Sequence, residues 1–432
     1  MKIKQKSMSF DKVLELARPK HKKPKKPNIL FRTLVKILST GELKKTKFEY
    51  SFVNCDKLPD KPSLILMNHS SFIDLKIASD IIYPKPFQIV CTTDGFVGKS
   101  WLMRNLGCIP TQKFVKDITL IQDIKYALTK NKTHVLMYPE AGYTFDGCCT
   151  TLQKGLSRLV RLLGVPVVNI QTFGAFLHDP LYNGLQLRRV PVSAHVETLF
   201  TKEQVESSSA EELSAKLKLA FAFDNFAWQK ENGIKITEDF RADGLERILY
   251  RCAHCNEEGC MKGEGIKLVC EKCGKSYSLT ELGELVADDG NTEFSHIPDW
   301  YDWQRASVRE ELISGKYALD TPVDIGMMVD YKSLYMVGKG RLVHSLEGFH
   351  LTGCDGKLDY KQKALASYGL NADYFWYEIG DMISIGNRDV LYYCFPKGGD
   401  VVAKTRLAAE ELYKRLAPVR KRRRKSAEDS EK

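Results

Sequence analysis

Short apolar runs alternate with helical stretches from about residue 49 to residue 245. Residues 117–129 and 151–163 carry apolar side chains at helical spacing. Strands that alternate with helices predict an α/β domain with a mainly parallel sheet flanked by helices. Four apolar runs have the length of buried strands: residues 63–67, 87–92, 134–138 and 165–170.

The pattern changes after residue 245. Residues 246–290 are rich in Cys and Gly and predict a small ribbon with short turns. Residues 291–417 begin with a helical stretch and continue, over 320–400, with aromatic and β-branched residues separated by Gly turns. This composition predicts a small antiparallel β domain, and residues 401–416 predict a closing helix that ends at Pro418. A charged tail, 418–432, follows; a chain of 432 residues is long enough for two or three domains.

The net charge of +11 lies entirely in the first 50 residues, which hold 15 Lys or Arg and 4 Asp or Glu. The remaining residues carry 50 charges of each sign. Residues 1–48 therefore predict a basic arm, densest over 20–26, followed by an amphipathic helix. The arm can bind an anionic membrane surface or be a solvated tail, and the helix can enter a bilayer surface or pack on the main domain. The chain has no apolar run of about 18 residues and no apolar signal-peptide core, so we expect neither a transmembrane helix nor export.

Two C-x2-C pairs, Cys252/Cys255 and Cys270/Cys273, are separated by 14 residues. Four thiolates at this spacing predict a closed, structural zinc site. Two disulfides or a redox pair are the alternative, and the absence of an export signal argues against them. Cys260 and His254 are competing ligands of lower rank, and Gly274 suits the tight turn after the second pair.

His69 and Asp74 lie in the segment Asn-His-Ser-Ser-Phe-Ile-Asp between an expected strand and an expected helix. On one continuous helix they would be about 140° apart around the axis. They can meet if the histidine lies in the turn and the aspartate in the first turn of the helix. The carboxylate would then fix the tautomer of the imidazole and leave the other ring nitrogen free as a general base. The alternative is a structural role, in which Ser71 and Asp74 form a capping box that starts the helix.

This segment resembles the first signature block of the glycerolipid acyltransferase family, which includes the 1-acylglycerol-3-phosphate acyltransferases. Three further blocks match in part and in order. The second runs from Gly107 to Lys113, which stands where the family has Arg. The third is residues 138–144, Tyr-Pro-Glu-Ala-Gly-Tyr-Thr against Phe-Pro-Glu-Gly-Thr-Arg-Ser, and the fourth is residues 165–170, with Asn169 in place of a proline.

The resemblance implies an O-acyltransferase in phospholipid biosynthesis that uses acyl-CoA or acyl-carrier protein. His69 would deprotonate the acceptor hydroxyl, Asp74 would orient it, and amides at the helix start would stabilise the oxyanion. Lys113 would meet an acceptor phosphate. The acceptor would be a lysophospholipid, first of all 1-acylglycerol-3-phosphate, at the cytoplasmic face of the cell membrane; Tyr143 in place of Arg leaves a different lysolipid open. The remaining substrate-binding positions implied are Asn68, Ser71, Gly107, Pro139, Glu140, Gly142 and Thr144.

Two rival functions are a non-enzymatic zinc-ribbon protein that binds membrane or nucleic acid through its arm, and an inactive acyltransferase fold kept as a scaffold. A binding protein needs no His/Asp pair, and nucleic acid is disfavoured because the rest of the chain has no net basic charge. Some bacterial relatives of the family carry a similar ribbon followed by a segment like residues 296–301. The C-terminal β unit resembles a pleckstrin-homology-type sandwich in element order, which implies a lipid- or protein-docking module.

Overall fold

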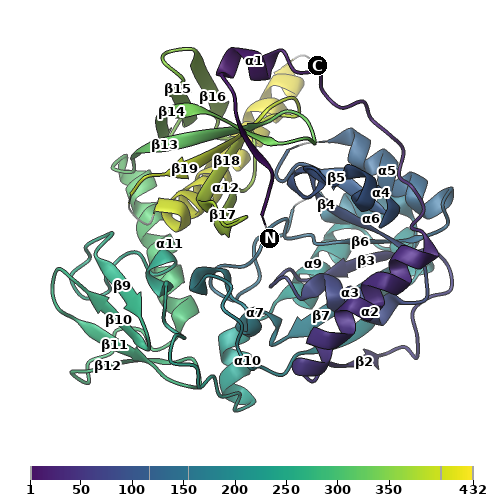
Figure 1. The fold of residues 1–432 in the computed structure, drawn as a ribbon, viewed down its shortest axis with the longest axis horizontal. Coiled ribbons are helices and arrows are strands. Elements are labelled where there is room, and N and C mark those ends of the chain that lie inside the picture. Colours follow the sequence, from purple (N-terminus) through teal and green to yellow (C-terminus); the bar gives the residue numbers. More distant parts are fainter. Residues whose placement is uncertain (1, 116, 154, 399–400, 431–432) are drawn as a thin grey trace.

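The computed structural model describes residues 2–115, 117–153, 155–398 and 401–430. A seven-stranded sheet forms the first domain, in the order β2-β8-β7-β3-β6-β4-β5 (Figure 1). All neighbouring strands are parallel except β7 and β8, so the prediction of an α/β domain with a mainly parallel sheet is confirmed. The strands are β2 (Glu49–Val53), β3 (Leu64–Met67), β4 (Phe87–Thr92), β5 (Cys108–Thr111), β6 (His134–Met137), β7 (Val167–Phe173) and β8 (Ser193–Phe200).

Helices cover both faces of this sheet, and the central strand β3 is buried at all four positions. Ile65 and Met67 join a core cluster with α3, while Leu64 and Leu66 join a second cluster with α5, α6 and α9 on the opposite face. This explains why the strand is apolar throughout rather than alternating. The helices are α2 (Ile29–Lys45), α3 (Asp74–Ile82), α4 (Ser100–Asn105), α5 (Ile118–Thr129), α6 (Leu156–Leu163), α7 (Ala175–His178), α8 (Lys202–Ser207), α9 (Ala210–Phe221) and α10 (Asn225–Glu231).

One predicted helix is shorter than expected. The stretch 151–163 was expected to be helical throughout, but α6 begins at Leu156. Thr151, Leu152 and Gln153 instead lie in a loop that lines the large cavity described below. Thr150, just before them, is bonded through its backbone N–H and its hydroxyl to the Glu140 carboxylate, which holds the loop away from a helical path.

The Cys-rich segment forms a four-stranded antiparallel sheet in the order β12-β11-β10-β9. The following helix, α11 (Ile297–Ser314), packs against it: the buried Trp300 donates from Nε1 to the Arg251 carbonyl at 3.0 Å, and its ring lies 5.0 Å from that of Tyr277. The strands are β9 (Met261–Glu264), β10 (Lys267–Cys270), β11 (Ser276–Leu279) and β12 (Leu285–Ala287).

The C-terminal domain is an antiparallel sheet in the order β16-β15-β14-β13-β19-β18-β17, closed by α12 (Val401–Ser430). Helix α12 runs through Pro418, so the prediction that it ends there is wrong. The proline removes one backbone hydrogen bond, and the carbonyl that loses it belongs to the exposed Lys414, where water can replace the bond. The Arg, Lys, Ala and Glu residues that follow are strong helix formers. The strands are β13 (Leu319–Met328), β14 (Leu334–Ser345), β15 (Gly348–Gly353), β16 (Leu358–Lys363), β17 (Asn371–Trp376), β18 (Gly380–Gly386) and β19 (Leu391–Pro396).

The N-terminal arm joins the two large domains. Strand β1 (Gln5–Ser7) pairs in parallel with β14, and the short helix α1 (Phe10–Leu14) buries Phe10 and Val13 against the C-terminal domain. The chain then runs along the α/β domain to α2 (Figure 1). On this path its backbone carbonyls accept hydrogen bonds from Arg104, Asn131 and Gln88. Over its described part the arm is therefore packed against both domains and is not a free tail.

None of the described helices is long and apolar enough to cross a membrane.

Candidate active site

His69 lies in the turn after β3, and Asp74 is the first residue of α3. The Nδ1 atom of His69 is 2.9 Å from Oδ2 of Asp74, so the two side chains meet across the strand-to-helix turn as the spacing required. Nε2, the other ring nitrogen, has no hydrogen-bond partner among the described residues. The imidazole faces a cavity, and its free nitrogen is therefore available to an incoming hydroxyl group.

The Asp74 carboxylate also organises the turn. Its Oδ2 atom accepts from the backbone N–H of Ser70 at 2.8 Å and of Ser71 at 3.2 Å, and the Ser71 hydroxyl accepts from the N–H of Ile73 at 3.3 Å. Only half of the predicted capping box therefore forms: Asp74 accepts from the Ser71 N–H, but the Ser71 hydroxyl bonds to Ile73 and not to Asp74, and α3 has no side-chain cap. A consequence is that three amides of the turn are already bonded and are not free for an oxyanion, contrary to the simple expectation. The N–H of Phe72 has no acceptor among the described residues.

Two tyrosine rings enclose His69. The ring of Tyr138 is stacked on the imidazole at a centroid distance of 4.0 Å, and the ring of Tyr143 lies on the other face at 4.0 Å. Both tyrosines come from the third block, which follows β6. The sandwich limits rotation of the imidazole and excludes water from its faces. Tyr143, which replaces the expected Arg, thus contacts the histidine itself.

Burial shifts both members of the pair toward their neutral forms. The loss of solvation lowers the pKa of His69 well below its usual value, and the nearby charge of Lys113 lowers it further. Burial raises the pKa of Asp74 to about 7 against the opposing effect of its two backbone donors. Above pH 7 the pair therefore consists of a carboxylate and a neutral imidazole, which is the form that a general base requires.

Two buried polar residues, Glu140 and Asn68, hold the turn that carries His69 without lining the cavity. Oε1 of Glu140 accepts from the His69 N–H at 3.1 Å, and Oε2 accepts from the Thr150 N–H at 2.8 Å. Oδ1 of Asn68 accepts from the N–H of Thr172 on β7 at 2.8 Å. Neither residue lines the cavity, and both are buried. Their geometry gives them a positioning role, whereas the resemblance implied contact with substrate.

The cavity has a volume of about 710 Å³ and lies at the carboxyl ends of β3, β4, β5 and β6. Open α/β sheets bind their ligands at this edge. Much of the lining is apolar, and one wall comes from the C-terminal domain: residues 365–368, 373–378, Tyr413 and Lys414. The C-terminal domain is therefore part of the site rather than an appendage.

The other predicted substrate positions divide into two groups. Ser71, Lys113 and Pro139 line the cavity. Gly142 and Thr144, which lie in the same loop as Pro139, do not line it, and neither does Gly107, which lies in the turn before β5. Gly107 adopts φ +84° and packs against Pro27 of the arm, and Thr144 donates from its hydroxyl to Asp146 at 3.1 Å.

The third block has a left-handed backbone conformation, which favours glycine, at the position where the family has Gly. Ala141, where the family has Gly, has φ +59° and lines the cavity. A non-glycine residue in this left-handed region is strained by about 1–2 kcal/mol. Contacts around the loop must therefore offset this backbone strain at Ala141.

Sequence reasoning missed two residues of the C-terminal domain. Asp373 on β17 is buried and lines the cavity; burial raises its pKa to about 6, and Lys113 acts in the opposite direction. Arg406 on α12 donates to the Tyr143 carbonyl at 3.0 Å, and its guanidinium lies 4.2 Å from the centre of the Phe145 ring. No local motif marks either residue, because each reaches the site only through the packing of the two domains.

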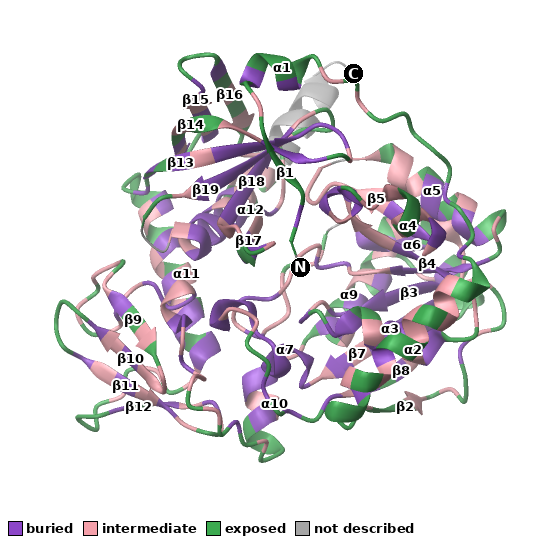
Figure 2. Ribbon diagram, viewed as in Figure 1, coloured by how far each residue is buried: buried purple, intermediate pink, exposed green. Residues whose placement is uncertain are grey.

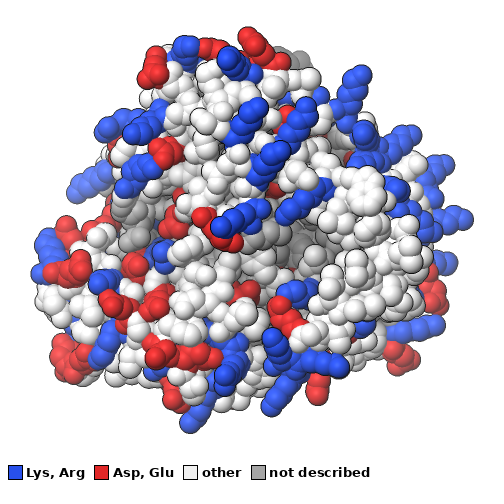
Figure 3. Space-filling model, viewed as in Figure 1, with Lys and Arg blue, Asp and Glu red and all other residues white. Residues whose placement is uncertain are grey.

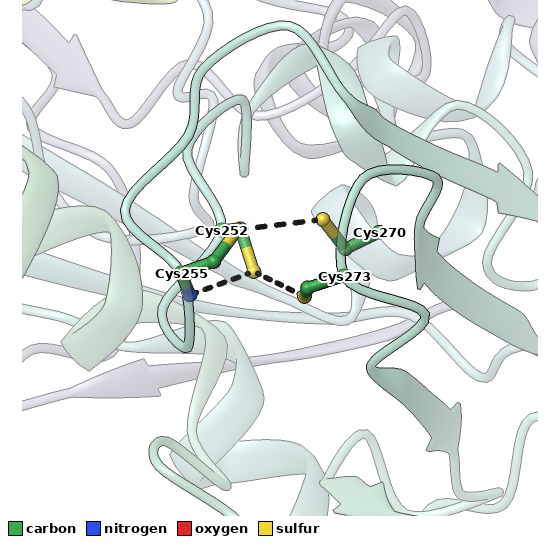
Figure 4. Close-up of side chains that lie close together, drawn as sticks. All are labelled: Cys252, Cys255, Cys270 and Cys273. Atoms are coloured by element: carbon green, nitrogen blue, oxygen red, sulfur yellow. Dashed lines mark hydrogen bonds between the residues drawn. The ribbon is translucent and has the colours of Figure 1, made fainter.

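The four predicted cysteine ligands come together in the ribbon (Figure 4). The Sγ atoms of Cys252 and Cys273 are 3.8 Å apart, and those of Cys255 and Cys270 are 3.7 Å apart. A tetrahedral ion with metal–sulfur bonds of about 2.3 Å would place its sulfurs about 3.8 Å apart. The four thiols could therefore hold a metal ion. The competing candidate His254 is exposed and lies 3.0 Å from Glu293, while Cys260 is 3.4 Å from Cys270 but outside the four-thiol set.

One family model matches the part of the chain that holds this site. Residues 49–172 match the family model named Acyltransferase, so the chain carries a domain of the acyltransferase family. The match includes both members of the His/Asp pair and the third block. A solved structure, the 1-acyl-sn-glycerophosphate (LPA) acyltransferase PlsC from Thermotoga maritima, is similar at 15% identity and a TM-score of 0.35, covering 44% of this chain and 76% of that one. A search of curated proteins found no match.

Proposed function

We propose that this protein is an O-acyltransferase that moves a fatty acyl group from an acyl thioester to a hydroxyl of a lysophospholipid. The observation that carries the proposal is the 2.9 Å contact between His69 and Asp74, with Nε2 of the histidine free at a largely apolar cavity. The hydroxyl proton passes to Nε2 as the oxygen attacks the thioester carbonyl. The tetrahedral intermediate then expels the thiolate, which recovers the proton from the imidazolium and leaves as a thiol.

The first candidate for the acceptor is 1-acylglycerol-3-phosphate. Lys113 supports it, because its ammonium group lines the cavity, 5.9 Å from the centre of the Tyr143 ring, and makes no ion pair among the described residues. A lysine meets phosphate as a point charge rather than through a bidentate fork. The buried Asp373 carboxyl shares the cavity, so a less anionic headgroup is the second candidate.

We propose that the protein acts at the cytoplasmic face of the cell membrane, to which it binds peripherally. Helix α2 exposes Leu30, Leu34, Ile37 and Leu38, each by 48% or more, and Trp101 next to it is 70% exposed. This apolar face is largely free of charged groups and is bordered by Lys and Arg (Figure 3). Figure 2 shows α2 as mostly exposed or partly buried, and its buried residues are Ser39 and Leu43. Lysines near an anionic surface contribute about 1 kcal/mol each, and Lys20, Lys22, Lys23, Lys25 and Lys26 are all exposed.

For the cysteine cluster we propose Zn²⁺ in a structural role. Four thiolates around a tetrahedral site leave no open position for a substrate. The ribbon is too small for a large core of its own, so a bound ion would stabilise the surface on which α11 packs.

Purified protein incubated with acyl-CoA or acyl-carrier protein and a panel of lysolipids tests the function. The wild type should form diacyl product, and His69→Ala should reduce turnover at least 1000-fold. His350→Ala is a matched control, because His350 forms an exposed pair with Asp359 at 2.7 Å. Full activity in His69→Ala, or no product from any donor and acceptor with the wild type, would refute the proposal.

A further inference from the structure

A second cavity of about 530 Å³ lies beside the catalytic one. It is formed between the loop after β5 and residues of strands β16, β17 and β18 with the turns near them. The two cavities share residues 113–115 and 365–367, so they adjoin at this point. A long substrate could therefore occupy both.

The charges that line the second cavity are all positive. They belong to Lys113, Lys361, Lys363 and Arg388, and no Asp or Glu is among the described lining residues. We call this cavity the basic cleft. The catalytic cavity differs, because its charges are mixed: Lys113, Arg158 and Lys414 with Asp74, Asp94, Asp373 and Glu378. In a chain whose charge balances beyond residue 50, a concave site with one sign of charge concentrates the field on an anion.

These cations are not engaged by acids. Lys361 and Lys363 are exposed and form no ion pair with a described residue. Arg388 donates to the Thr119 hydroxyl at 2.9 Å, and its carbonyl accepts from Gln112 at 3.1 Å. Arg388 therefore bridges the two domains at the cleft, and its hydrogen bonds leave its charge uncompensated.

We infer that the basic cleft binds the phosphate-bearing nucleotide end of acyl-CoA, while the thioester reaches His69 through the adjoining cavity. This assignment rests on the proposed function. A volume of about 500 Å³ is within the range of small-ligand sites, and the pantetheine arm of coenzyme A separates its thioester from its nucleotide phosphates. A carrier protein would instead lay a folded surface over the cleft and leave it unfilled. The acyl-transfer domain thus supplies the chemistry, and the C-terminal domain selects the donor.

The double variant Lys361→Ala/Lys363→Ala tests the assignment in the full-length protein. Both side chains are exposed on the edge strand, so the fold should persist. The KM for acyl-CoA should rise about tenfold, because charge-assisted contacts to phosphate are lost, while the KM for the lysolipid should stay unchanged. Acyl-pantetheine, which lacks the nucleotide, should be used equally by wild type and variant. The control Lys332→Ala/Lys339→Ala removes two exposed lysines of the same domain that lie outside the cleft.

Direct titration of coenzyme A by calorimetry separates this inference from the proposed function, because binding needs no turnover. The wild type should bind coenzyme A more tightly than dephospho-coenzyme A, and the difference should shrink in the double variant and at high salt. An unchanged KM for acyl-CoA in the double variant would overturn the assignment. So would a change in the lysolipid KM alone, which would assign the cleft to a headgroup, or use of acyl-carrier protein only.

Discussion

Replacing Asp74 by Asn separates catalysis from folding stability. In this variant kcat should fall while the free energy of unfolding at pH 8 should rise. The amide has nearly the shape of the carboxyl group but carries no charge. In the wild type the carboxylate faces the imidazolium that forms when His69 takes the hydroxyl proton. Two unit charges about 4 Å apart interact by about 4 kcal/mol at an effective dielectric constant of 20. Loss of this term predicts a decrease in kcat of about 1000-fold.

Stability should rise in the same variant at pH 8. Burial raises the pKa of Asp74 from 3.8 to about 7, and each tenfold change in the ionisation constant corresponds to about 1.4 kcal/mol. Because the folded-state pKa lies above the unfolded-state one, the fold is destabilised as the pH rises from about 4 to about 7 and the full effect remains above it. A neutral Asn is expected to increase the free energy of unfolding at pH 8 by a few kcal/mol, about 4 at most.

The assay pairs turnover of acyl-CoA and lysolipid with urea unfolding at pH 8 and pH 5. The stability gain of Asp74→Asn should be present at pH 8 and smaller at pH 5. Asp359→Asn, in the exposed pair with His350, should change neither quantity. Turnover within tenfold of the wild type would contradict the role given to Asp74, and lower stability at pH 8 would contradict the burial argument.

Further outcomes are expected from the same geometry. The activity should fall tenfold per pH unit below about pH 7, where the pair gains a proton, and a flat profile from pH 5 to 8 measured as kcat/KM would exclude this assignment. Cys270→Ser should remove bound zinc, measured by elemental analysis, and lower the melting temperature; metal-free protein with unchanged melting would exclude a structural ion. Asp373→Asn should lower the KM for a phosphomonoester acceptor severalfold by leaving Lys113 unopposed, and the opposite shift would favour a cationic headgroup. Ala141→Gly should raise the free energy of unfolding by about 1 kcal/mol, because it relieves a positive φ.

Features that depend on near neighbours in the chain could be predicted from the sequence. The contact between His69 and Asp74 joins residues five positions apart, and a strand, a turn and a helix start are enough to form it. The same holds for the two cysteine pairs, which are joined by one hairpin. The apolar runs of the parallel strands identified the α/β domain, because strands buried on both faces must be apolar throughout.

The walls of the site depended on contacts between distant parts of the chain, and no local pattern encodes these. Asp373 and Arg406 belong to the C-terminal domain, and they reach the catalytic loops because that domain packs over the carboxyl edge of the sheet. Strand β1 pairs with β14 more than 300 residues away, so the start of the arm is a structural link, a role that neither of the two predicted alternatives included. Such pairings form because they bury surfaces that exist only after each domain has folded. The sequence by itself therefore determined the contact between His69 and Asp74 and the clustering of the four cysteines, whereas the tertiary structure decided the shape and charge of the cavity in front of the His/Asp pair.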